Sequence, residues 1–285
     1  MEDITKYRDY VKRSAEASVR NAESLQELMR FEAKMKGSLS LENKLLAKAY
    51  YADATEIRTE ADWRDFGIGV FDKSHPIHQL FCREVGGEEE IQIMYDIDAT
   101  NALAYDFEQF TDPGFFADRL LLMHPCPIKF FETEKMGGDK VRYSPEDGVI
   151  YATNGIRDDT ELCQLFLKEY AHFYLHEYDT QLAEREVSNE AIEADESEDY
   201  DRKARGLEAH AVMYALCVRH GLETPNMDKV QVSAALTPED ILQILMGIDY
   251  AIYRITQLIE DIGNRRERRE SCYFREKEHS QSARQ

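Results

Sequence analysis

The sequence lacks several features that would place a protein in a definite class. Its five cysteines are odd in number and scattered, with no C-x-x-C pair, and no apolar run approaches the roughly 20 residues of a membrane span. The first 14 residues are charged throughout, so they do not read as a signal peptide. We therefore expect a cytoplasmic protein with reduced thiols and no membrane partner. The apolar fraction of 43% is enough to bury a core, which excludes wholesale disorder.

Basic residues are also in short supply, with 35 Lys and Arg against 56 Asp and Glu, a net charge of −21. A chain this acidic is a poor generic binder of phosphate backbones. The deficit is local, because residues 1–80 carry −1, residues 81–264 carry −23 and residues 265–285 carry +3. Nine acids and one arginine fall within residues 184–201, a pattern typical of a solvated loop. Residues 1–80 are thus nearly neutral, so charge weakens nucleic-acid binding by this region without excluding it.

Apolar residues at three- and four-residue spacing predict one long helix over residues 1–35, which Gly37 ends. A second helix, capped by Ser38 or Ser40, should reach residue 51. The pattern then predicts strands at 69–71, 77–82, 91–97, 128–132 and 149–153, with helices after Asp98 and over 113–123.

Three longer helices are predicted towards the end of the chain, over residues 158–178, 203–220 and 238–262. The last should begin with Thr237 as its cap and Pro238 at its first position. We therefore expect an α+β protein. It comprises an N-terminal domain of helices and a small sheet (1–90), an α+β domain (91–264) that includes the acidic loop, and a disordered Arg-rich tail (265–285).

A possible metal motif lies in the helix predicted over residues 158–178. Zinc peptidases use H-E-x-x-H, because residues four apart share a helix face and the glutamate activates the metal-bound water. Glu169 and His172 occupy the second and last places of that motif, but Lys168 stands where the first histidine belongs. Glu208, which opens a later apolar helix, is the candidate for a third ligand.

Several segments, in this order, resemble one known family. They read YSPEDGVI (143–150), TEL (160–162), KEYAHFYLH (168–176) and LEAHAVMYALCVRHGLET (207–224). They resemble the zincin-like metallopeptidase domain of ArdC-type antirestriction proteins, and most of all the LtrC-like branch found on conjugative elements and phages. Upstream, SLSLENKLL (38–46), ADAT (52–55) and the segment around Trp63 are similar to that family's N-terminal single-stranded-DNA-binding domain, and YDIDAT (95–100) to its junction segment. The resemblance spans about residues 5–262.

The resemblance implies metal ligands at positions 168, 172 and 208, with Glu169 as the general base. A protonated lysine offers no lone pair to a metal, so we expect no cofactor, or zinc only if the site is retained. Our hypothesis is that the Lys168 ammonium lies between Glu169 and Glu208 in place of the metal, in a domain that is not catalytic. In the alternative, His172 and His176, four residues apart, form a displaced zinc site with Glu208 or His210, and the protein is an active metallopeptidase.

Binding of single-stranded DNA requires basic groups and aromatic stacking platforms. The candidate platforms are Trp63, Phe66, Phe71, Tyr50 and Tyr51. The candidate basic residues are Lys44, Lys48, Arg58, Arg64 and Lys73. The competing interpretation places Trp63 and Phe66 in the core. We therefore expect an accessory protein of antirestriction type, carried by a mobile element or phage, that binds a protein or DNA partner. The alternatives are the active metallopeptidase and a protein that protects single-stranded DNA.

Overall fold

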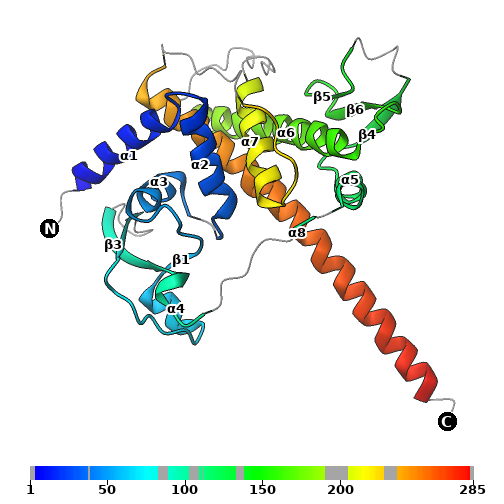
Figure 1. The fold of residues 1–285 in the computed structure, drawn as a ribbon. Coiled ribbons are helices and arrows are strands. Elements are labelled where there is room, and N and C mark those ends of the chain that lie inside the picture. The colour runs from blue at the N-terminus through cyan, green and yellow to red at the C-terminus, as the bar shows by residue number, and fades with distance from the viewer. Residues whose placement is uncertain are drawn as a thin grey trace.

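The computed structural model describes residues 4–37, 39–82, 89–102, 109–110, 112–132, 138–189, 205–227 and 236–282 (Figure 1). Helices and two small sheets alternate along the chain, so the predicted α+β class is confirmed. The N-terminal elements are α1 (Ile4–Ser18), α2 (Ala22–Lys34), α3 (Leu41–Tyr50), β1 (Ile57–Thr59), α4 (Glu60–Asp65), β2 (Ile77–Cys82), β3 (Glu89–Asp96) and the 3₁₀ turn η1 (Ile97–Ala99). The later elements are α5 (Pro113–Leu122), β4 (Ile128–Phe131), β5 (Val141–Ser144), β6 (Val149–Thr153), α6 (Asp159–Asn189), α7 (Gly206–Arg219) and α8 (Pro238–Ser282).

The long helix predicted over the first 35 residues is two helices. The Asn21 side chain accepts a hydrogen bond from the backbone N–H of Ser24 at 2.8 Å and so starts α2 as a separate helix. Ser40, one of the two predicted caps, begins α3 by accepting from the N–H of Asn43. At the other end of the chain, Thr237 exchanges hydrogen bonds with Asp240 and caps α8 as predicted.

Each sheet has three strands. The first has the antiparallel order β1-β3-β2, and the second has the order β4-β6-β5, with β4 parallel and β5 antiparallel to β6. Strand β5 is an edge strand that the sequence did not predict. The predicted strand at 69–71 is reduced to a single bridge between Val70 and Thr100.

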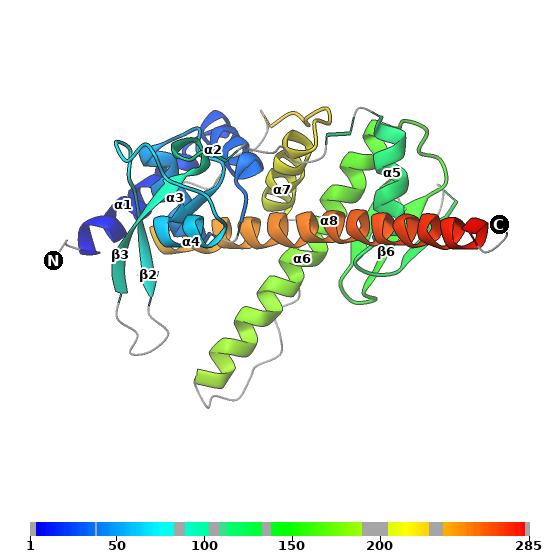
Figure 2. The same cartoon turned by 90° about the horizontal axis from the view of Figure 1, so that it is seen from below.

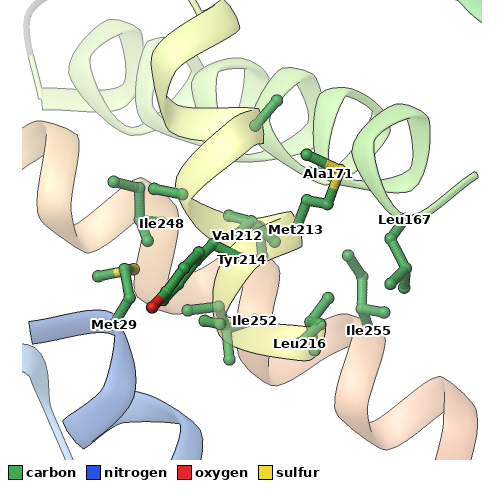
Figure 3. Close-up of a cluster of buried hydrophobic side chains, with 14 of the residues drawn as sticks. Met29, Leu167, Ala171, Val212, Met213, Tyr214, Leu216, Ile248, Ile252 and Ile255 are labelled. Atoms are coloured by element: carbon green, nitrogen blue, oxygen red, sulfur yellow. The ribbon is translucent and has the colours of Figure 1, made fainter. Parts of the chain in front are cut away.

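The main core joins elements from both ends of the sequence. Figure 3 shows Met29 of α2, Tyr214 of α7 and Ile252 of α8 lying together, all of them buried. Helices α6 and α8 cross, and α7 packs against both (Figure 2). Within the described residues, no helix is both long and apolar enough to cross a bilayer.

Two of the longer helices extend beyond their predicted ends. Helix α6 continues past residue 178 into the acidic run, of which residues 190–201 lie outside the described residues. Helix α8 continues past residue 262 to Ser282, within the Arg-rich tail that was predicted to be disordered. Arg, Glu and Lys are good helix formers, so the absence of apolar periodicity did not mark a helix end. The predicted domain limits at 90 and 264 stay predictions.

Candidate functional site

One side of α6 carries four titratable residues in successive turns, namely Glu169, His172, His176 and Asp179. Their spacing of three, four and three residues places them along one stripe of the helix. Glu169 and His172 are each only 1% exposed, so the two residues that match the metal motif lie in the interior. Strand β5 and helix α7 both pack against α6.

Strand β5 is fixed to the stripe by Tyr143. The Glu169 Oε2 accepts a hydrogen bond from the Tyr143 backbone N–H at 2.8 Å, and the Tyr143 hydroxyl lies 2.9 Å from Nδ1 of His176. Burial raises the pKa of Tyr143 to about 12 and lowers the pKa of His176. The Glu169 carboxylate therefore satisfies a backbone donor on the open edge of β5, a task that holds the strand against the helix.

The C-terminal end of the stripe is closed by Arg205, which stands just before α7. Its guanidinium donates to Glu208 Oε2 at 2.6 Å and, from Nε, to Asp179 Oδ2 at 3.1 Å, while its Nη2 donates to the other oxygen of Asp179. Burial, opposed by Arg205, raises the pKa of Glu208 to about 7. One cation thus holds two partly or fully buried carboxylates together, with a bidentate pairing on Asp179.

The predicted contact between Lys168 and Glu208 is wrong, because the cation that pairs with Glu208 is Arg205. Arg205 joins Glu208 to Asp179, and Asp179 lies 11 residues, or about 16 Å along the axis, from Lys168. Lys168 is half-buried, and it forms no ion pair with any residue that the structure describes. Burial is the main cause of the lowered pKa of His210, and the positive charge of Lys168 lowers it further.

The residues present do not fit a zinc ion. Across the described ranges, no three His, Cys, Asp or Glu side chains are arranged to hold a metal, and the set His172, His176 and Glu208 is not brought together. His210 is turned to another partner, since its Nε2 lies 3.1 Å from the backbone oxygen of Asn226. At the two other positions of the implied ligand set, the Lys168 ammonium has no lone pair to offer a metal, and the Glu208 carboxylate is bound to the Arg205 guanidinium.

One local pattern in the sequence points to Arg205. Arg205 and Glu208 are three apart at the start of a helix, which is the spacing of an ion pair. Asp179 likewise continues the spacing of His172 and His176 by one more turn. Their meeting depends on how α7 packs on α6, which no local pattern reveals.

The residues predicted to bind DNA are divided between the interior and the surface. Trp63 is 1% exposed and its Nε1 donates to the backbone oxygen of Tyr95 at 3.0 Å, so its indole ring is not open to a base. Lys44 is buried between Glu32 and Asp249. Lys48 is half-buried, whereas Arg64 and Lys73 are exposed and both pair with Glu60.

Two of the other candidate stacking residues, Phe66 and Phe71, are exposed beside these basic groups. Phe66 is 65% and Phe71 is 74% exposed. The Arg58 guanidinium lies 4.5 Å from the centroid of the Phe66 ring. Phe66 and Phe71, and not Trp63, therefore present the exposed aromatic rings beside these basic groups.

Comparison with known proteins gives a limited answer. No family model matches the chain, and no curated protein matches it. Among solved structures, the chain is similar to the metal-free crystal structure of the antirestriction protein ArdC from plasmid R388, with 16% identity, 89% of this chain and 98% of that chain covered, and a TM-score of 0.46. It is also similar to the Mn(II)-bound structure of the same protein, with 14% identity, 87% and 97% coverage, and a TM-score of 0.48. A likeness at this level assigns neither a function nor a site residue.

Proposed function

We propose that this chain is an accessory protein of antirestriction type, from a mobile element or phage, whose zincin-like domain binds a partner and does not cleave it. The observation that carries the proposal is the guanidinium of Arg205 between Asp179 and Glu208. The resemblance to ArdC-type antirestriction proteins implies that Glu208 binds a metal. In this chain an internal cation already neutralises that carboxylate.

The state of Glu169 supports the same conclusion. A general base must reach the proton that it removes. Here Oε2 of Glu169 is engaged by the Tyr143 backbone N–H, and the carboxylate is almost fully buried. The role supported by these contacts is to position β5 on α6, which shapes a binding surface without chemistry.

The proposal is tested by comparing Glu169→Gln with the wild type in cells that carry a restriction system. Gln keeps an oxygen that can accept from Tyr143 but cannot act as a base, so we expect protection of incoming DNA to be unchanged. Metal analysis of the purified wild type should find well below one zinc per chain. Stoichiometric zinc that is lost in His172→Ala, together with loss of protection in Glu169→Gln, would establish the active metallopeptidase instead.

A second candidate function is binding of single-stranded DNA, and the exposed Phe66 and Phe71 rings favour it. Base stacking on an aromatic side chain contributes about 1–3 kcal/mol per base. We expect Phe66→Ala combined with Phe71→Ala to weaken binding of an oligonucleotide at low salt by at least tenfold. Exposed Phe130, in β4, provides the matched control, because Phe130→Ala removes the same ring elsewhere. Equal affinity of all three proteins, or no binding by the wild type, would remove this function.

A further inference from the structure

A cavity of about 300 Å³ lies where the end of α2 meets α3, the end of α7 and the middle of α8. Three basic side chains form part of its wall, those of Lys36, Lys44 and Arg219, and each is more than nine-tenths buried. One carboxylate, that of the exposed Glu260, lies at the same wall. Buried lysine and arginine side chains are rare unless they are paired, and of these three Lys44 is paired with Glu32 and Asp249.

Lys44 has a donor to spare. Its ammonium carries three N–H groups, and two of them are used by Glu32 Oε2 at 2.8 Å and by Asp249 Oδ1. Lys44 forms no third hydrogen bond with the described residues, and the other oxygen of Glu32, Oε1, is also without a partner. A buried ammonium proton without an acceptor is costly, and Lys44 lines the cavity.

A second donor comes from Thr256 of α8. Its Oγ1 accepts a hydrogen bond from Nη1 of Arg219, whose other nitrogens donate to the backbone oxygens of Ala33 and Glu32 and so cap the end of α2. The hydroxyl proton of Thr256 must therefore point elsewhere. It meets no acceptor in the described part of the chain, and Thr256 is buried at the cavity wall.

We propose that this cavity binds a small molecule through a carboxylate or phosphate group. Both groups present several acceptor oxygens that the third N–H of Lys44 and the hydroxyl of Thr256 can donate to, and their negative charge is favourable beside the side chains of Lys36 and Arg219. The cavity is at the small end of the range of ligand sites. Met35 and Ile252, which also line it, give an apolar surface for the remainder of the molecule. This site lies apart from the α6 stripe and does not depend on the function proposed above.

The test is isothermal titration calorimetry of the full chain with inorganic phosphate and, separately, with succinate. We expect one of the two to bind with a stoichiometry of one, and the identity of that anion separates a phosphate site from a carboxylate site. Glu260→Gln removes a like charge from the wall and should tighten binding about three- to tenfold. Glu239→Gln makes the same change on an exposed part of the same helix, away from the cavity, and should leave the affinity unchanged.

Thr256→Val should weaken binding about tenfold, whereas Thr256→Ser, which retains the hydroxyl, should not. If Thr256→Val fails to fold, the comparison of Glu260→Gln with Glu239→Gln still decides the matter. The proposal is overturned if neither anion binds the wild type, which would mean that water alone meets these donors. It is also overturned if binding occurs but Glu260→Gln does not change it.

Discussion

Replacing Arg205 with alanine should lower the free energy of unfolding by about 3 kcal/mol at pH 8. Removing one partner of a buried ion pair typically costs 3–5 kcal/mol, because it leaves the other charge buried without compensation. Here two carboxylates lose the same guanidinium, and the side chain of Glu208 is only 6% exposed. We expect a loss at the lower end of that range, because Glu208 can take up a proton and so avoid remaining as a buried, unpaired charge.

The pH dependence of this effect follows from Glu208. Burial, opposed by Arg205, raises its pKa to about 7 from an ordinary 4.5, so the folded protein holds a proton that the unfolded chain has released. The contribution of this bound proton to the free energy of unfolding is full below pH 4.5, and it is lost as the pH rises through 7. The wild type should therefore lose up to about 3 kcal/mol over this interval from Glu208 alone. At pH 5, where Glu208 is protonated, Arg205→Ala should cost much less than at pH 8.

Urea unfolding at pH 5 and pH 8 measures both effects. A glutamine side chain is neutral at every pH. The stability of the Glu208→Gln variant should therefore lack the part of the decline with rising pH that Glu208 causes in the wild type. Lys140→Ala removes one partner of an exposed pair with Glu161 and should change stability by less than about 0.5 kcal/mol. A loss for Arg205→Ala equal to that of Lys140→Ala at pH 8 would show that the three charges are not coupled in the folded protein.

The sequence predicted the stripe on α6 but not the residue that completes it. Glu169, His172 and His176 follow from helical spacing within one segment, which is local information. Arg205 meets Asp179 across 26 residues of sequence, so their contact depends on the packing of α7 against α6. Lys168, the cation predicted to pair with Glu208, does not do so, because Arg205 occupies that place.

The fold shows the same division between local and tertiary information. Caps such as Ser40 and Thr237 could be predicted, because their hydrogen bonds reach only three residues along the chain. Trp63 could be placed either in the core or on a binding surface, because an aromatic ring suits both. Only the tertiary structure buries it under Tyr95 and leaves Phe66, three residues later, exposed.

Replacing Lys44 with methionine should also lower the free energy of unfolding by about 3 kcal/mol. Methionine keeps an unbranched chain but removes the ammonium that joins Glu32 of α2 to Asp249 of α8. Burial dominates the raised pKa of Glu32, so this carboxylate is already unfavourable in its charged form.

Lys48 lies one turn further along the same helix and supplies the control. It is half-buried and forms no ion pair with a described residue, so Lys48→Met should change stability by less than about 0.5 kcal/mol. Urea unfolding at pH 7 measures both variants. Both lysines were predicted to bind DNA, and the comparison separates two roles. A stable Lys44→Met protein with weakened DNA binding would place Lys44 at an interface, whereas a destabilised one makes it the link between the N-terminal helices and α8.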